Sequence, residues 1–500
     1  MAEAAESRDA TLEAEVLREP LAEEPEWLTA AALTVGRLDC SPRLEALMPL
    51  QLYPRCESGL TQRISPEMPS LGSAPQLHDV REEIAKRSRF YRADFSTAVT
   101  HWSKTLAASL FMFFATLFST VALGAHLQQA TDNAIGLSEY LLMNSVAGVL
   151  HALFGAQPLL IIRPTGPITT IMHKLYTLAS SMGVPFHQLL AATCIWVSLF
   201  LLFMGFFGAS RHLQRLTPFT YEIFACFVCS IYVYDGVSDM YRRFTSDKLD
   251  NLGMSLLDLN LALVVLFLSI KLQTAREWRF FSAGVRAFIA DYAVTIAIFV
   301  ATACSYYFQI ATTEILRIQL PSSFAPSLEG RAWYSGSLTS TSLHTWLVAA
   351  IVAVPISFFF FMDQGISSLL CQLPVLGLAR GSYYHSSFVS LGLLNMFGGL
   401  FGCPFVTGSL PHSPQFVRAL RLQGAADGMQ VAESRVAPLL VYLLIGVPLL
   451  APSLIKMVPE AAIDGVLIFV GYEVRGVCGA VRWAWCRCGW YGVGAAPLLL

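Results

Sequence analysis

Two widely separated stretches of this chain interrupt long apolar runs with paired prolines. The first contains Pro164-Thr165-Gly166-Pro167, and the second contains Pro411-His412-Ser413-Pro414. Proline removes a backbone donor and clashes with a continuing helix, so each break leaves peptide groups without helical partners. Hydrocarbon tolerates such groups only where they are buried in protein or line a cavity. Paired breaks of this kind in the two halves of a membrane chain point to the binding site of a transporter.

The composition places most of the chain in a lipid bilayer. Of the 500 residues, 55% are hydrophobic and only 14% are charged, whereas soluble domains carry about 25% charged residues. The formal net charge of −2 argues against a nucleic-acid partner, which needs a basic surface. Cys226 and Cys229 form a C-x-x-C pair with no second pair or histidine cluster beside it. No metal site and no cofactor are therefore expected.

Apolar runs of spanning length follow one another from about residue 105 onward. They predict an all-α polytopic membrane protein. Three of the expected helices are too short or too interrupted to span alone and are interpreted as half-helices, at 164–180, 411–421 and 462–473. The other helices are expected at 105–125, 137–154, 186–208, 217–235, 254–272, 284–309, 344–371, 384–401 and 435–453.

The N-terminal region is expected to be a cytoplasmic tail over residues 1–93, largely disordered because it is polar, acidic and contains prolines. The positive-inside rule supports this side, since basic residues precede the first helix and none lies in the loop 128–136. A later loop that falls outside on an alternating count carries Arg242, Arg243 and Lys248, so the rule is followed imperfectly.

The residues at the two breaks suit a small oxyanion. A discontinuous helix presents free backbone N–H groups and a partial positive charge at its N-terminal end. The first break offers Thr165 and Gly166, and the second offers Thr407, Gly408 and Ser409. Hydroxyls and exposed amides from two facing half-helices predict an anion site, although ordinary proline kinks in long helices are the alternative.

Asp363 is an acid directly after the apolar stretch Phe358-Phe-Phe-Phe-Met362. Intramembrane acids are expensive and are functional candidates by default. Helical spacing puts Ser367 on the same face one turn later. The pair is expected to hold a coupling ion, either Na⁺ bound by both oxygens or a proton carried by the carboxylate. A carboxylate at a helix end that reaches water is the alternative.

Arg163 and His412 each have two open interpretations. Arg163 immediately precedes Pro164, and it either supplies positive charge to the site or extends its side chain to the membrane surface. His412 either titrates near neutral pH or stays neutral and makes a structural hydrogen bond. We include both residues among the candidates for substrate binding.

A series of segments resembles the bicarbonate transporter (anion exchanger, solute-carrier-4) family over roughly residues 94–472. Each segment alone is weak evidence, but the occurrence of all of them in the family's order is specific. They are Gly155-Ala-Gln-Pro-Leu-Leu160, Thr165-Gly-Pro167, Tyr221-Glu-Ile-Phe224, Ala290-Asp-Tyr-Ala-Val294, Phe361-Met-Asp-Gln364, the stretch 402–420, and Glu433-Ser-Arg-Val436.

The resemblance implies two inverted seven-helix repeats, with a core domain that carries the half-helices and moves against a gate domain, in a homodimer. It implies bicarbonate, carbonate or borate as substrate. Thr165 and Gly166 match the family's first half-helix. Asp363 matches the acidic position of its eighth helix, and Ser367 matches a hydroxyl used in sodium-coupled members.

Two departures from the family pattern bear on substrate. His412 falls where chloride–bicarbonate exchangers carry an arginine. The sequence Leu410-Pro-His-Ser-Pro414 is closer to that of the borate-transporter and proton/hydroxide-conducting branch. Arg163 replaces a small residue. One hypothesis is that Arg163 supplies, from the opposite half-helix, the charge of the missing arginine.

The C-terminal residues differ from the family. After Tyr472 the family continues through two further helices, whereas residues 474–500 are rich in Trp, Cys and Gly without a spanning run. The expected organisation is therefore a tail over 1–93, a transmembrane domain over 94–473 that lacks the family's last two helices, and an atypical tail over 474–500.

The sequence thus predicts a secondary-active carrier of a small inorganic oxyanion, by anion exchange or ion-coupled transport, and not an enzyme. Borate efflux or proton/hydroxide conduction, and a truncated membrane product without transport, remain as alternatives. The expected location is the plasma membrane, with a cytoplasmic N-terminus. The expected partners are the anion, Na⁺ or H⁺, the lipid bilayer and a second copy of the chain.

Overall fold

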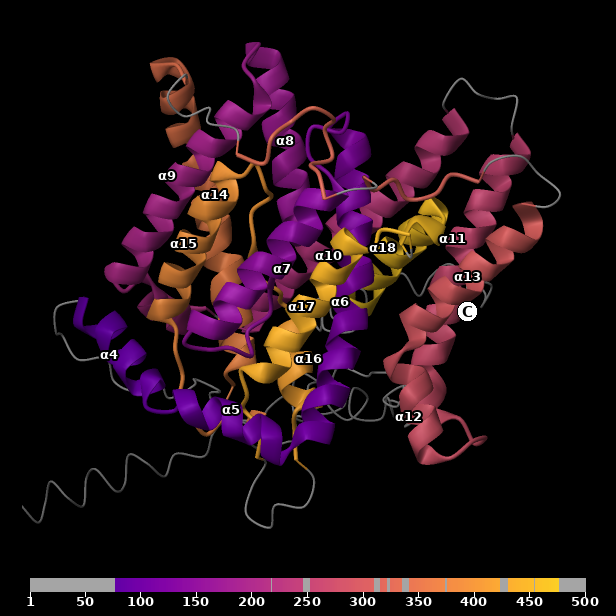
Figure 1. Ribbon diagram of the computed structural model, residues 1–500. Coiled ribbons are helices and arrows are strands. Elements are labelled where there is room, and N and C mark those ends of the chain that lie inside the picture. The colour runs from indigo at the N-terminus through magenta and orange to yellow at the C-terminus, as the bar shows by residue number, and fades with distance from the viewer. Residues whose placement is uncertain are drawn as a thin grey trace, which may run out of the picture. The chain divides into compact units, whose positions relative to one another are not determined.

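The computed structural model describes residues 77–216, 218–245, 252–309, 315–321, 324–334, 341–373, 376–422, 430–453 and 455–475. Residues 1–76 of the expected N-terminal tail and 476–500 of the expected C-terminal tail lie outside this part of the chain. The described part is built almost wholly from helices (Figure 1), which confirms the all-α class.

The helix positions follow the apolar runs closely. In chain order the α-helices are α4 (Leu77–Ser88), α5 (Tyr91–Thr100), α6 (Trp102–Ala130), α7 (Leu137–Phe154), α8 (Gly166–Met182), α9 (Phe186–Phe206), α10 (Pro218–Thr245), α11 (Leu252–Gln273), α12 (Ala283–Asp291), α13 (Ala293–Gln309), α14 (Leu343–Cys371), α15 (His385–Leu400), α16 (His412–Ala419), α17 (Val436–Leu450) and α18 (Glu460–Arg475). Short 3-10 turns occur at η1 (Ala209–Arg215), η3 (Thr274–Glu277) and η5 (Ile455–Met457).

Within the described residues, six helices are long and apolar enough to cross a membrane, or seven if a bent pair counts as one span. Large apolar side chains are exposed along several of them, as expected of a surface that faces lipid, including Phe203, Phe227, Phe299, Ile351 and Phe358. The chain is therefore a multi-pass membrane protein.

Two expectations from the sequence need correction. The single helix expected at 284–309 is two helices, α12 and α13, which meet at a bend of 69°. Arg276 pairs with Asp291, the last residue of α12. The second correction concerns the boundary at residue 93, because α4 and the start of α5 are helical.

Helices α4 and α5 are joined to the rest of the fold by buried charges. Asp94 is fully buried and accepts from Arg87 at 2.8 Å, from Arg435 at 2.9 Å and from Arg380. Glu433 accepts from Arg87 at 3.3 Å and from the backbone of Ala379 at 2.7 Å. We therefore assign residues 77–93 to the membrane domain.

The helices form two groups. One group packs α9 against α14 and α15, and α7 against α6 and α17. The other packs α18 against α10 and α11, and α11 against α13, with its own buried apolar cluster. In Figure 1, α11, α12 and α13 lie on one side of α18, while α9, α14 and α15 lie on the far side of α7. Helix α6 contacts both groups.

The two proline breaks meet. Strand β1 (Ile162–Arg163) precedes α8, and strand β2 (Thr407–Gly408) precedes α16, and the two strands pair antiparallel. Proline lies at the start of α8 and directly before α16, where its missing N–H costs nothing. The pairing brings the beginnings of the two half-helices to one place, as the sequence predicted.

Candidate functional site

The crossing of β1 and β2 satisfies its own backbone groups. Ile162 pairs with Gly408 and Arg163 pairs with Thr407. Ser409 N–H donates to the carbonyl of Ile161 at 2.7 Å, and the N–H of Ile162 donates to the hydroxyl of Tyr442 at 2.8 Å. Non-helical backbone at membrane depth needs such partners, so the crossing is a fixed platform.

Helix α14 holds β2 in place from the side. The N–H of Gly408 donates to Oε1 of Gln364 at 2.7 Å, and Oγ of Ser367 donates to the carbonyl of Gly408 at 2.7 Å. A Cβ at Gly408 would lie 2.8 Å from Oε1 of Gln364 and 2.9 Å from Cβ of Ser367. Glycine is therefore required here because α14 approaches the strand too closely for any side chain.

Arg163 is buried, with 1% of its surface exposed, so it does not extend to the membrane surface. Its Nε donates to the carbonyl of Pro164 at 3.1 Å, and Nη1 donates to Oγ of Ser119 at 2.6 Å. Its Nη2 has no hydrogen-bond partner, and no carboxylate forms an ion pair with it among the described residues. A buried cation left in this state favours an anion beside it.

Other buried polar atoms at the crossing are also unpaired. Thr165 Oγ1, Thr407 Oγ1, Asp363 Oδ2 and Gln364 Nε2 lack partners among the described atoms. Asp363 lies beside Thr407 and is 3% exposed. Buried polar groups in native proteins are nearly always hydrogen-bonded, so several unpaired atoms around one crossing indicate a place for a polar ligand.

The beginning of α8 is covered by the second helix group. Thr165 precedes the helix but makes no side-chain cap. The N–H of Gly166 donates to the hydroxyl of Tyr232 on α10 at 2.9 Å, and a Cβ at Gly166 would lie 2.8 Å from the Tyr232 ring. Tyr232 therefore links α10 to the positive end of the half-helix.

Ser409 and His412 bind each other. Oγ of Ser409 and Nδ1 of His412 are 2.7 Å apart, and the ring lies beside the backbone of Ala115. The two side chains that face each other here both come from the second break. The crossing thus brings together Arg163, Thr165, Thr407, Gly408, Asp363 and Ser367, while Ser409 and His412 pair beside it.

Sequence reasoning did not select several residues that build the site. Gln364 carried a signal, because it is a polar residue next to Asp363 in an otherwise apolar helix. Ser119, Tyr232 and Tyr442 carried none, since each lies in an ordinary apolar run and reaches the crossing only through the packing of distant helices.

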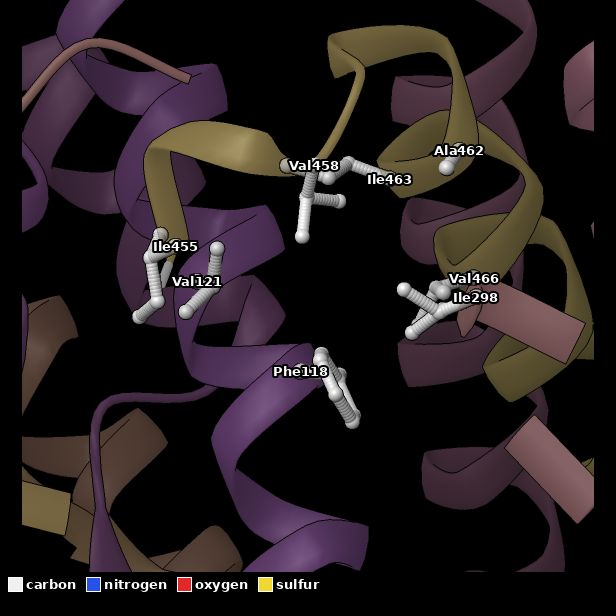
Figure 2. Close-up of a pocket in the computed structure, with 8 residues that line it drawn as sticks. All are labelled: Phe118, Val121, Ile298, Ile455, Val458, Ala462, Ile463 and Val466. Atoms are coloured by element: carbon white, nitrogen blue, oxygen red, sulfur yellow. The ribbon is translucent and has the colours of Figure 1, made fainter. Parts of the chain in front are cut away.

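A pocket near α6 has a different character. Figure 2 shows eight side chains around it, all apolar, among them Phe118 of α6, Ile298 of α13 and Val466 of α18. Without a polar lining, such a space cannot replace the hydration of an anion. It lies where α6 meets the second helix group, and we interpret it as a small gap in the packing between them.

Comparisons with known proteins agree with this fold. The chain is 24% identical over 461 residues to anion exchange protein 3 of Plecturocebus moloch, and the match covers 83% of this chain and 37% of that protein. It is 26% identical over 382 residues to the probable boron transporter 6 of Arabidopsis thaliana, with coverage of 71% and 55%. The chain thus spans only part of the length of these relatives.

A solved structure shares the fold. The transmembrane domain of the cyanobacterium bicarbonate transporter BicA superposes with a TM-score of 0.51 at 16% identity, covering 76% of this chain and 94% of that one. The family described as the HCO3⁻ transporter integral membrane domain matches residues 76–256 and 250–477, which includes the helices α4 and α5. Its relatives named above are transporters, not enzymes. The chain therefore belongs to the bicarbonate transporter family, and anion transport is the activity of its relatives.

Proposed function

We propose that this chain is a secondary-active carrier of a small inorganic oxyanion, bicarbonate, carbonate or borate, which binds at the crossing of β1 and β2. The single observation that carries the proposal is the buried, unpaired Nη2 of Arg163. A guanidinium with no carboxylate partner is a costly feature in a membrane domain. A bound anion offsets that cost.

The other groups at the crossing suit the same ligand. Thr165 has a hydroxyl without a partner, and Thr407, which lies beside Asp363, stands opposite Arg163 in the strand pair. Hydroxyls donate to oxyanions, and the beginnings of α8 and α16 add a favourable dipole. Bicarbonate and borate offer the same kind of oxygen acceptors, and an anion exchange protein and a probable boron transporter both match this chain.

Asp363 is the proposed coupling group. Its Oδ2 is unpaired and buried, and no arginine neutralises it among the described residues. The carboxylate takes up either Na⁺ or a proton as the anion binds. Ser367 supports this role indirectly, because its hydroxyl proton is committed to the carbonyl of Gly408 while its oxygen lone pairs remain available.

Alternating access follows from the two helix groups. The group that carries the crossing moves against the group of α10, α11, α13 and α18, and the contact between Tyr232 and Gly166 breaks and forms during the cycle. We place the chain in the plasma membrane as a homodimer with a cytoplasmic N-terminus, in keeping with the basic residues before α6.

The test is anion flux in liposomes that contain the purified chain. Bicarbonate and borate are compared, each with a Na⁺ gradient, with a pH gradient and with neither. Flux of one anion above that of empty liposomes identifies the substrate, and the gradient that concentrates it identifies the coupling ion. Absence of flux for both anions under all three conditions would overturn the proposal.

A further inference from the structure

A second cluster of charged groups lies away from the crossing, between α6 and α10. His126 is on α6, and Asp235 and Asp239 are on α10. Nδ1 of His126 contacts Oδ2 of Asp239, and Nε2 lies 3.9 Å from Oδ1 of Asp235. The side chains of all three are at most 9% exposed. Helix α10 belongs to the second helix group, and α6 contacts both groups.

The two carboxylates beside the imidazole favour an extra proton on the cluster. A neutral imidazole has one N–H and one lone pair, whereas an imidazolium has two N–H groups. Here both ring nitrogens face carboxylate oxygens, so a neutral ring would set a lone pair against one of them. A proton on the second nitrogen, or on the facing carboxylate, turns that repulsion into an attraction.

The charge balance leads to the same conclusion. Arg242 pairs with the other oxygen of Asp239, so the two acids share one permanent cation. Oδ2 of Asp235 is buried without a partner. With a neutral histidine the cluster carries one uncompensated negative charge, and with one added proton its charges balance. Buried charges without compensation are strongly disfavoured.

In the part of the chain that the structure describes, neighbouring elements do not supply the missing cation. Within the described part, Arg242 is the permanently charged cation that acts on Asp235, and His126 acts on it only when protonated. From α7, Tyr140 lies within electrostatic range of Asp235, and from α8, His173 lies within range of His126. Helix α18 approaches α10 at Gly236 through the backbone of Asp464.

We propose that His126, Asp235 and Asp239 form a proton-binding site that is separate from Asp363. The site takes one proton from water, with no other reactant, and the bound proton holds α6 to α10. His126 lies 24 residues along α6, about 36 Å from its start beside α5, so the site is at the end of the domain opposite the N-terminal helices.

The position on α10 connects this site to the crossing. Tyr232, which accepts from Gly166, precedes Asp235 by one helical turn and Asp239 by two, so all three share a face of α10. Release of the proton loosens α6 from α10 and frees the same helix that covers α8. This consequence for transport rests on the proposed function, whereas the proton site itself does not.

The first test measures thermal stability of the purified full chain at about pH 5.5 and about pH 8.5, on either side of the ordinary histidine range. The variants are His126→Gln and Asp235→Asn. The control is Gln129→Ala. It removes a hydrogen bond of 2.8 Å from α6 to Glu460, but glutamine itself does not titrate.

Linkage fixes the sign of the result. If the folded chain holds the proton on the cluster, both variants lose more stability at the lower pH than at the higher pH, and the control loses the same at both. If the folded chain holds a neutral histidine, His126→Gln is relatively less harmful at the lower pH. That opposite sign would overturn the proposal, whether or not the protein transports an anion.

The second test measures flux in liposomes while the pH on one side is changed from about 6 to about 8. The rate of each variant is divided by the wild-type rate at the same pH, so that the ionisation of the anion cancels. A ratio that changes severalfold with the pH on one side only supports the link to transport. A constant ratio on both sides would overturn that link.

Discussion

Ser367 and Gly408 are joined across 2.7 Å by a hydrogen bond from the serine hydroxyl to the glycine carbonyl. This contact ties the long helix α14 to the strand β2, although the two residues are 41 positions apart. It places Asp363, one turn earlier on α14, beside the strand pair. The position of the acid relative to the proposed anion site therefore depends on how closely α14 and β2 approach.

The close approach predicts the effect of Gly408→Ala. The added Cβ meets Gln364 and Ser367 at under 3 Å, so the variant must separate β2 from α14. We expect a loss of about 1–3 kcal/mol in stability, as for overpacked cores, and a loss of flux. Thermal melting and flux measure the two effects.

The matched control for that variant is Gly253→Ala. Gly253 lies in α11, and no atom is within 4 Å of a Cβ placed there. Alanine is the better helix former, so this variant should melt at the same temperature as the wild type or slightly higher. Equal losses in the two variants would contradict the role of the α14 contact.

Arg163→Gln should separate stability from function. The arginine is buried and has no carboxylate partner in the described part of the chain, so its removal relieves an uncompensated charge. We expect the purified variant, measured without anion, to be as stable as the wild type or more stable. A loss of several degrees in melting temperature would instead assign Arg163 a structural role.

Asp363→Asn should remove coupling. The amide keeps the size of the side chain but cannot neutralise Na⁺ or carry a proton. We expect a Na⁺ or pH gradient to concentrate the anion with the wild type and to have no such effect with the variant. Concentrative uptake that persists in Asp363→Asn would move the coupling site elsewhere. The His126 cluster would then be the next candidate.

The sequence predicted the helices and their breaks well, because apolar length and proline act locally. The alignment of Ser367 with Asp363 also followed from helical spacing. The pairing of Arg163 with Thr407 could not be predicted in the same way, because it joins segments from opposite halves of the chain. The burial of Arg163 was equally open, since it depends on Ser119 of another helix.

The helices α4 and α5 show another limit of sequence reasoning. The polar composition of residues 77–93 indicated a tail, since burial of Arg87 is expensive without a partner. Burial of Arg87 becomes favourable only when it meets Asp94, which also binds Arg435 from a distant part of the sequence. No local pattern reveals such a cluster. The same holds for His126 and Asp239.

Asp94→Asn tests this buried cluster. Asp94 accepts from three arginines, and an amide leaves their charges without compensation. We expect a loss of about 3–5 kcal/mol in stability, as for other broken buried pairs, seen as a marked fall in melting temperature. The exposed Glu329→Gln is the control and should not change it.

The most direct test of the account is the half-saturating anion concentration for flux in Arg163→Gln liposomes, measured with the anion that the wild type carries. The control is Arg89→Gln, which removes an exposed arginine of the same charge. Loss of a charge-assisted hydrogen bond to the anion predicts a rise of roughly tenfold or more in Arg163→Gln and none in the control. An unchanged half-saturating concentration in Arg163→Gln would contradict the claim that the anion binds at the crossing of β1 and β2.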